Sequence, residues 1–287
     1  MLLTTKYVFF GTPQFAAIIL EKLINSGFIP EAVVCNPDKP VGRKKIITPP
    51  PTKLLAVKYN ILVLQPEVLS ISNFQFSISN FDFFIVASYA KIIPKEILEI
   101  PRLGAIGVHP SLLPKYRGSS PIQTAILKGD AKTGVTLFLM DEKIDHGPIL
   151  SQSEIQISQS ETYTSLHDKL AELGAELLID FLKKYENIRK DEKIEGMPQD
   201  ESQATYTKKF SNKDAYIEPL DLEKAQNEGG EIAIQIDRKI RGLNPEPGTW
   251  TIKNGKRVKI LEAILTVGNK LKLKKIQFEG KKPIEIY

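Results

Sequence analysis

A histidine and an acidic loop are the residues of this sequence whose types and spacing could carry acid–base chemistry. His109 directly follows an apolar run at residues 105–108, so its imidazole is expected at the carboxyl edge of a sheet. Histidine exchanges a proton near neutral pH more readily than other side chains do. Residues 140–147 follow the next apolar run, and a carboxylate there could fix the tautomer of His109. The spacing alone leaves a structural histidine at a strand end as the alternative.

The elements that would position these residues alternate along the first part of the chain. A helix with a proline in its first turn is expected at residues 13–23, and a long helix at residues 161–184. The apolar runs that read as strands are residues 7–10, 31–35, 61–64, 83–87, 105–108, 133–140 and 149–157. This alternation predicts an α/β fold with a Rossmann-like, mostly parallel sheet and helices on both faces. In such sheets ligands bind beyond the carboxyl ends of the strands.

The composition excludes several classes of protein. Of the 287 residues only Cys35 is a cysteine and only three are histidines, which excludes an internal disulfide framework and a Cys-based zinc site. We therefore expect no metal. Apolar runs stay far below the roughly 20 residues that cross a bilayer, and residues 1–10 run directly into Gly11-Thr12-Pro13. These residues are interpreted as a strand, not a signal peptide, so we expect a cytoplasmic protein with no membrane contact.

The charge is distributed unevenly between two parts of the chain. Residues 1–205 hold 22 Lys and Arg against 23 Asp and Glu, whereas residues 206–287 hold 17 against 11, which together give the net +5. A polar stretch separates the two parts, so the prediction is a first domain at 1–188, a linker at 189–205 and a C-terminal domain at 206–287. The basic module indicates a polyanionic partner, and the alternative is an ordinary lysine-rich surface.

The C-terminal part has the pattern of a small β module. Short strands are expected at residues 249–252, 258–265, 270–273 and 284–287, with a helix near residues 232–241. Asn254-Gly255 and Gly268-Asn269 mark turns. Short strands in a lysine-rich module predict a small β-barrel that is OB-like, the architecture that binds oligonucleotides.

Several motifs resemble a known family. His109-Pro110-Ser111-Leu112-Leu113-Pro114, followed by Arg117-Gly118, is similar to the signature of the 10-formyltetrahydrofolate-dependent formyltransferases, and the loop with Asp145 matches their acidic site. Residues 10–16, 36–45, 240–250 and 255–260 resemble the branch formed by the methionyl-tRNA formyltransferases. The resemblance implies formyl transfer from the co-substrate 10-formyltetrahydrofolate to the α-amine of methionine on initiator methionyl-tRNA. His109 would take the amine proton and Asp145 would orient and polarise His109.

The resemblance also implies which residues bind the two substrates, and we expect a monomer. The folate would contact Ser88, Tyr89, Lys91, Ile92, Ser111, Leu112, Leu113 and Pro114. The tRNA would contact a basic loop formed by Arg43, Lys44 and Lys45. It would also contact basic side chains of the C-terminal part, namely Lys208, Lys209, Arg238, Arg241, Lys256 and Arg257. Ordinary loop packing and solvated surface are the alternatives for these two sets.

One catalytic position departs from the family pattern. The family has an asparagine two residues before the histidine, and this sequence has Gly107 there. Loss of one oxyanion donor costs about 2.7–4 kcal/mol of transition-state stabilisation. A water or backbone donor could replace the amide, the enzyme could be slow, or the protein could bind tRNA without turnover. A formyltransferase acting on a small amine, such as an amino sugar nucleotide, is a further alternative that would not need the basic loop or the basic C-terminal module.

Overall fold

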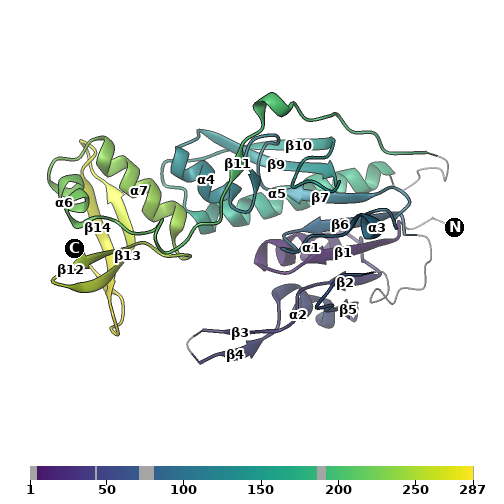
Figure 1. The fold of residues 1–287 in the computed structure, drawn as a ribbon, viewed down its shortest axis with the longest axis horizontal. Coiled ribbons are helices and arrows are strands. Elements are labelled where there is room, and N and C mark those ends of the chain that lie inside the picture. The colour runs from purple at the N-terminus through teal and green to yellow at the C-terminus, as the bar shows by residue number, and fades with distance from the viewer. Residues whose placement is uncertain (1–4, 43, 71–80, 186–191, 287) are drawn as a thin grey trace. The chain divides into compact units, whose positions relative to one another are not determined.

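The structure, a computed structural model, describes residues 5–42, 44–70, 81–185 and 192–286. Its largest element is a seven-stranded sheet with the strand order β10-β9-β7-β6-β1-β2-β5 (Figure 1). The strands are β1 (Tyr7–Gly11), β2 (Ala32–Val34), β5 (Leu62–Leu64), β6 (Phe83–Ala87), β7 (Ala105–His109), β9 (Lys132–Leu139) and β10 (Ile149–Gln156). All seven lie on apolar runs that the sequence marks as strands, so the predicted series is confirmed.

The middle of this sheet is parallel and fully buried. β5, β2, β1, β6 and β7 pair in parallel, and β9 pairs with β7 in the antiparallel direction. Every residue of β1, β6 and β7 is buried, as expected for central strands that are covered on both faces. The predicted Rossmann-like, mostly parallel sheet is therefore confirmed, with β9 as an antiparallel neighbour of the strand that carries His109.

Helices cover both faces of the sheet, as predicted. α1 (Gln14–Asn25) contacts β1, β6 and α2 (Pro51–Lys58). The part of α5 (Tyr163–Tyr185) around Gly174 packs on Ile19 of α1 and on Val108 of β7, which places α1 and α5 on the same face. α3 (Lys95–Leu98) packs in the opposite cluster with Phe84 and Ala105. Because side chains alternate along a strand, His109 shares the α3 face with Ala105.

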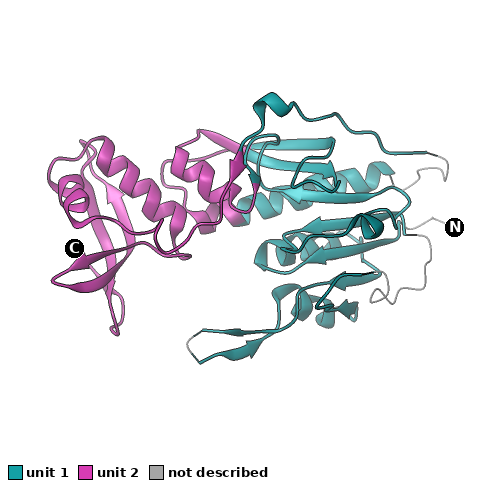
Figure 2. Ribbon diagram, viewed as in Figure 1, with its two compact units in different colours: residues 1–117, 134–154, 168–205 teal, residues 118–133, 155–167, 206–287 magenta. Residues whose placement is uncertain are grey.

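The chain divides into two compact units (Figure 2). Unit 1 contains Met1–Arg117, Gly134–Glu154 and Asp168–Thr205. Unit 2 contains Gly118–Thr133, Ile155–His167 and Tyr206–Tyr287. The C-terminal residues therefore form a unit together with two earlier segments of the chain, which a division at a single linker does not include.

Unit 2 combines helices with a small antiparallel sheet. Its four strands pair in the order β12 (Trp250–Lys253), β13 (Lys256–Leu265), β14 (Leu271–Phe278) and β15 (Ile284–Glu285). α6 (Pro219–Asn227) and α7 (Glu231–Leu243) pack on this sheet. α7 also contacts α4 (Pro121–Lys128). The predicted small C-terminal β module is confirmed as an antiparallel sheet.

Three further features of the structure are not expected from the sequence. β3 (Lys39–Val41) and β4 (Ile46–Thr48) form an exposed two-stranded hairpin around the basic loop. β8 (Arg117–Gly118) pairs with β11 (Tyr206–Thr207). Residues 193–205, here named the return segment, contain a single 3₁₀ turn, η2 (Glu201–Gln203), and belong to unit 1. Met197 of this segment pairs with Ile149 through two backbone hydrogen bonds of 2.8 Å. The described part of the predicted linker is thus fixed to unit 1, and residues 189–191 lie outside the described residues.

Candidate active site

His109 is the last residue of β7 and is buried between two acceptors. Its side chain is 7% exposed, and its Nδ1 lies 3.5 Å from Oδ2 of Asp145. On the other side of the ring, Nε2 donates to the carbonyl oxygen of Tyr116 at 2.9 Å. The structure therefore brings together the two residues that the sequence names as the acid–base pair. An imidazole held between two acceptors has a fixed orientation.

Asp145 sits in a tightly bent loop. Its φ is +49°, in the left-handed region that side-chain-bearing residues seldom adopt. In the same loop His146 Nδ1 lies 2.5 Å from Asp141 Oδ2, and the backbone N–H of Lys143 donates to Asp141 Oδ1 at 2.9 Å. These contacts close the loop on itself.

The turn after His109 is held by its own hydrogen bonds. Ser111 Oγ donates to the carbonyl of Lys115 at 2.6 Å. Thr136 of β9 lies opposite His109 in the sheet, donates to the carbonyl of Ser111 and accepts from the backbone N–H of Leu113. Leu113 is buried, whereas Leu112 and Pro114 are partly exposed. The Ser-Leu-Leu-Pro motif therefore fixes the chain between His109 and Tyr116.

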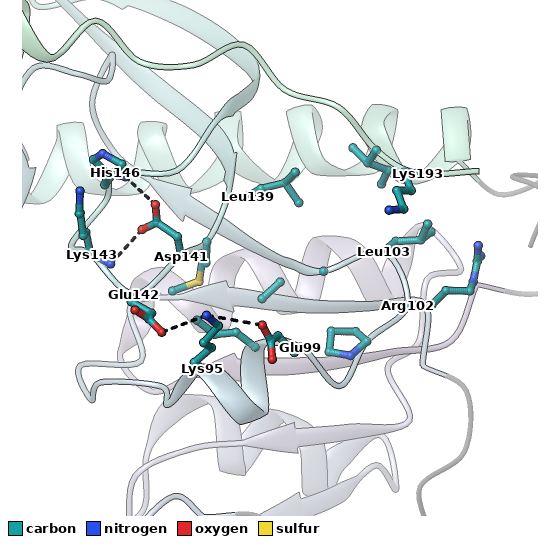
Figure 3. A pocket seen from close by; sticks show the side chains of 16 residues that line it. Lys95, Glu99, Arg102, Leu103, Leu139, Asp141, Glu142, Lys143, His146 and Lys193 are labelled. Carbon is teal, nitrogen blue, oxygen red and sulfur yellow. Dashed lines mark hydrogen bonds and ion pairs between the residues drawn. The ribbon is translucent and has the colours of Figure 1, made fainter. Parts of the chain in front are cut away.

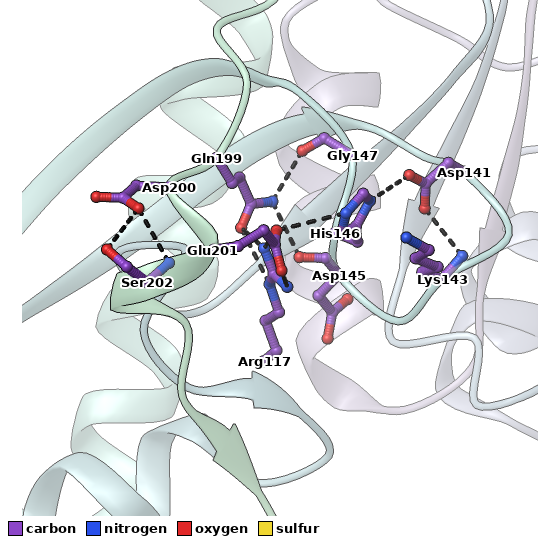
Figure 4. Close-up of polar contacts among 10 residues, drawn as sticks. All are labelled: Arg117, Asp141, Lys143, Asp145, His146, Gly147, Gln199, Asp200, Glu201 and Ser202. Carbon is purple, nitrogen blue, oxygen red and sulfur yellow. Dashed lines mark hydrogen bonds and ion pairs between the residues drawn. The ribbon is translucent and has the colours of Figure 1, made fainter.

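Arg117 is a buried cation whose partners come from the return segment (Figure 4). Its side chain is 0% exposed, and it donates to Gln199 Oε1 and to both carboxylate oxygens of Glu201 at 2.7–3.1 Å. These hydrogen bonds lower the pKa of Glu201, with Arg117 as the largest cause. The Glu201 carboxylate also lies 3.4 Å from Nε2 of His146.

Sequence reasoning misses Gln199 and Glu201. They lie in a polar stretch without apolar periodicity, which is typical of a linker. The only signal that could reveal them is indirect: an arginine adjacent to the motif at a buried strand needs acceptors, because a buried guanidinium without partners is very costly. Nothing in the spacing shows that these acceptors come from more than 80 residues further along the chain.

Gly107 lies beneath an aromatic ring. It pairs across the sheet with Phe138 of β9, whose side chain is 1% exposed. A β-carbon added to Gly107 would lie 2.3 Å from Cε1 and 2.5 Å from Cζ of Phe138. The space beside Gly107 is therefore filled by the apolar ring of Phe138 and not by a hydrogen-bond donor that would replace the asparagine.

A cavity of about 590 Å³ opens in unit 1 beside the Asp145 loop (Figure 3). Its volume lies in the range of sites that bind small molecules. Apolar and charged side chains are interspersed around it: Arg102 and Lys193 lie beside Leu103, and a second charged group that includes Asp141 and Lys143 lies on the opposite side (Figure 3). The lining includes Leu98, Leu103, Leu139, Met140, Lys95, Arg102, Asp141, Glu142, Lys143, His146, Lys193 and Ile194. The loop that carries Asp145 and the start of the return segment thus share one cavity.

The predicted folate residues near β6 lie in different surroundings and do not line this cavity. Tyr89 is buried in the apolar cluster that also contains Leu98 and Ala105, and burial raises the pKa of its hydroxyl to about 12. Lys91 Nζ donates to the carbonyls of Pro66 and Glu67, both at 2.9 Å. Ser88 and Ile92 are exposed, and Ser88 has a φ of +49°. Tyr89 therefore shares an apolar cluster with two residues of the cavity lining, Leu98 and Ala105, and none of the eight predicted folate residues is among those lining the cavity.

The predicted tRNA residues of unit 1 lie on the hairpin. Lys44 and Lys45 are exposed at the turn between β3 and β4. Next to them Val41, Ile46 and Ile47 expose more than half of their surface. Arg43 lies outside the described residues. The hairpin thus presents cations and apolar side chains together to solvent.

The predicted tRNA residues of unit 2 fall into two classes. Arg241 bonds Asp237 Oδ2 at 2.7 Å and the carbonyl of Glu161 at 2.6 Å, and the guanidinium of Arg238 packs against Gly129 at the end of α4. Both arginines thus make contacts inside unit 2. The remaining predicted cations lie nearer the surface: Lys208 pairs with Asp214, Arg257 stacks on Trp250 at 4.3 Å, and Lys209 and Lys256 are exposed.

Two kinds of feature are absent from the described residues. Across residues 5–42, 44–70, 81–185 and 192–286, no three His, Cys, Asp or Glu side chains are grouped so that they could hold a metal ion. Within these same ranges no helix has the length and apolar character needed to span a bilayer.

Comparison with known proteins gives the family. Residues 5–182 match the formyl transferase family, and residues 230–270 match the formyl transferase C-terminal domain. The chain is 44% identical over 260 residues to the methionyl-tRNA formyltransferase of Caldicellulosiruptor saccharolyticus, covering 89% of this chain and 78% of that protein.

Solved structures share the fold at low sequence identity. The methionyl-tRNA formyltransferase of Clostridium thermocellum matches with a TM-score of 0.64 and 18% identity, over 98% of this chain and 99% of that chain. The sugar 3N-formyl transferase WlaRD, solved in the presence of dTDP and 5-N-formyl-THF, matches with a TM-score of 0.63 and 21% identity, over 92% of this chain and 87% of that chain. Because residues 5–182 match the family and a methionyl-tRNA formyltransferase is 44% identical to this chain, this protein belongs to the formyl transferase family.

Proposed function

We propose that this protein transfers the formyl group of 10-formyltetrahydrofolate to the α-amino group of methionine on initiator methionyl-tRNA, in support of translation initiation. The observation that carries the proposal is the contact of 3.5 Å between His109 and Asp145 at the carboxyl end of β7, in a chain of this family. The 44% identity to a methionyl-tRNA formyltransferase supports the choice of acceptor.

The reaction requires two proton transfers, and the His109–Asp145 pair can carry out both. The neutral amine attacks the formyl carbon, a C–N bond forms, and the bond from that carbon to N10 of the folate breaks. One proton leaves the attacking nitrogen and one must reach the departing N10. His109 accepts the first proton and returns one to N10, while the Asp145 carboxylate stabilises the charged imidazole. The net reaction therefore needs no further reactant.

The cavity beside the Asp145 loop supports a place for the folate. Leu98, Leu103 and Met140 offer apolar surface for a flat pterin ring, and Asp141 and Glu142 offer acceptors for its N–H groups. A folate whose pterin ring lies in this cavity would place its N10 near Asp145. We propose that Tyr89 supports the cavity wall, and that Ser88, Lys91, Ile92 and the Ser111–Pro114 turn border the path to it.

The exposed cations support a place for the tRNA. Lys44 and Lys45 on the hairpin, with Arg43 between β3 and β4 in the sequence, would meet the phosphates of the acceptor end, and Lys209, Lys256, Lys208 and Arg257 would hold the nucleic acid at unit 2. Arg238 and Arg241 are better suited to shaping that surface from below, because both are engaged within unit 2. The proposed domain roles are catalysis for residues 1–188, connection for 189–205 and tRNA binding for 206–287.

The same function has two consequences for the protein as a whole. Aminoacylated tRNA is found in the cytoplasm, so we propose that location. The His109–Asp145 pair and the cavity are built from residues of a single unit of one chain, which supports a monomer.

The decisive experiment is a formylation assay with purified protein, 10-formyltetrahydrofolate and charged initiator tRNA. We expect formyl-methionyl-tRNA, and no product from free methionine or from an amino sugar nucleotide. Formylation of the amino sugar nucleotide instead would show that the acceptor is a small amine. Tight tRNA binding without product from either acceptor would show a binding protein.

A further inference from the structure

Both members of the acid–base pair are held by the return segment. Gln199 Nε2 donates to the carbonyl oxygen of Asp145 at 3.0 Å and to that of Gly147 at 2.8 Å. Asp145 has a φ of +49°, a conformation that persists in folded proteins only where surrounding contacts enforce it. Gln199 therefore clamps the bent loop from both sides of His146.

The orientation of the Gln199 amide is itself fixed. Arg117 donates to Gln199 Oε1 from Nε at 3.1 Å and from Nη2 at 2.8 Å (Figure 4). Arg117 can only donate, so the amide oxygen must face it and the amide NH₂ must face the two carbonyls. Glu201 binds the same guanidinium with both carboxylate oxygens, at 2.7 and 3.0 Å, which keeps the planar group in place.

The same segment also reaches the other end of the pair. Thr205 Oγ1 accepts from the backbone N–H of Tyr116 at 2.8 Å, and its carbonyl accepts from the N–H of Arg117 at 2.8 Å. The Tyr116 carbonyl is the group that accepts from His109 Nε2. The return segment thus sets the position of Asp145 through Gln199 and of the histidine through Tyr116.

We propose that Gln199 is a positioning residue that keeps the Asp145 carboxylate within reach of His109 Nδ1. The inference rests on the proposed function for its kinetic consequence. Its geometric consequence, the placing of Asp145 against His109, does not depend on which substrate is used. Gln199 is not among the residues that line the cavity, and the lining part of the loop is held separately by the contacts of Asp141 with His146 and Lys143. Loss of Gln199 therefore lowers kcat and leaves substrate binding in place.

The isosteric variant Gln199→Glu tests the donor function. It keeps the acceptor that Arg117 uses, removes the NH₂ group and puts a negative charge against the carbonyls of Asp145 and Gly147. Gln203→Glu is the matched control, because it makes the same change at an exposed position of the same segment. If Gln199→Glu fails to fold by circular dichroism, Gln199→Met, which has similar volume and no charge, takes its place in both measurements.

The first measurement is kinetic, with formyl donor and charged initiator tRNA. We expect Gln199→Glu to lower kcat by tenfold or more, to change the KM for each substrate by less than threefold, and to leave the protein folded at the assay temperature. Gln203→Glu should match the unmodified protein in all three. A rise in KM at unchanged kcat, or no change in either, would overturn the proposal.

The second measurement reads the geometry without turnover. The chain has only three histidines, so the ring ¹⁵N resonances of His109, His146 and His167 can be assigned with single variants. The His109 resonances should move in Gln199→Glu and stay in place in Gln203→Glu. Unmoved His109 resonances would refute the clamp. Unmodified protein that forms no formyl-methionyl-tRNA would instead refute the proposed function, and the resonances would still decide the role of Gln199.

Discussion

Phe138 lies directly across the sheet from Gly107, and its ring occupies the place that a side chain on residue 107 would need. The two residues form one packing unit, in which the aromatic ring of β9 covers the bare backbone of β7. An asparagine at position 107 and a phenylalanine at position 138 are therefore mutually exclusive in this geometry. In this structure the glycine at residue 107 is thus matched by the phenylalanine ring on the neighbouring strand.

Gly107→Asn is therefore expected to destabilise the protein without raising its rate. Overpacking of a dense core costs about 1–3 kcal/mol, and here the added β-carbon would lie 2.3 Å from the Phe138 ring. Urea unfolding and the single-turnover formylation rate measure the two effects. In the double variant with Phe138→Ala the two losses should not add, with a coupling of about 0.5–3 kcal/mol. A tenfold or larger gain in rate from Gly107→Asn alone would show that an amide fits beside the ring after all.

His109→Ala is expected to lower the single-turnover rate of formyl transfer by about 10²–10⁴-fold, the usual contribution of a positioned acid–base group. Asp145→Asn should have nearly the same effect, because an amide cannot stabilise a charged imidazole at 3.5 Å. Affinity for tRNA should stay within a few-fold in both. His167→Ala on α5 is the control, since the ring of His167 packs against Tyr163 of its own helix. Near-normal rates in either active-site variant would show that other residues carry out the proton transfer.

The exposed lysines of the hairpin are expected to bind tRNA by charge. Changing Lys44 and Lys45 to alanine should reduce the dependence of log K on log[salt] by about 0.7–0.9 for each phosphate that the lysines no longer neutralise, while the affinity for folate stays the same. The comparison variant changes Lys183 and Lys184 at the end of α5, which removes the same charge from another exposed site. If both double variants change the slope equally, the hairpin makes no specific contact.

Cys35 is expected to resist thiol reagents until the protein unfolds. It is fully buried, and burial raises the pKa of its thiol from 9.0 to about 11, so little thiolate is present at pH 8. Because the folded state favours the protonated form, this group adds stability below pH 9 that is lost as the pH rises toward 11. Labelling kinetics with and without urea provide the measurement. Rapid labelling of the native protein at pH 8 would show that the end of β2 opens readily.

The positions of the strands and of the acid–base pair could be predicted because local signals specify them. Buried parallel strands have continuous apolar runs, and His109 follows such a run directly. Asp145 is identified by a motif, since nothing in periodicity distinguishes it from Asp141 or Glu142. α4 also has local signals, with Pro121 in its first turn and Gly129 at its left-handed C-cap.

The polar side of the site could not be predicted in the same way. Gln199 and Glu201 act through hydrogen bonds to a residue more than 80 positions earlier, and hydrogen bonding leaves no periodic trace in a sequence. The ring of Phe138 beside Gly107 depends on the register of β7 with β9, which a sequence pattern does not specify. Likewise Arg238 and Arg241 carry the charge of tRNA ligands, yet their packing against Gly129 and Glu161 emerges only from the fold.

The late position of the return segment in the chain also determines the order in which a ribosome can complete the site. His109, Arg117 and Asp145 are synthesised long before Gln199, and the segment that matches the formyl transferase family ends at residue 182. The seven-stranded sheet contains no residue after Gln156, so it can form while the chain is still being made. The clamp on Asp145 closes only when residues 199–205 have left the exit tunnel. A nascent chain can therefore form the sheet before Gln199 is available to hold Asp145.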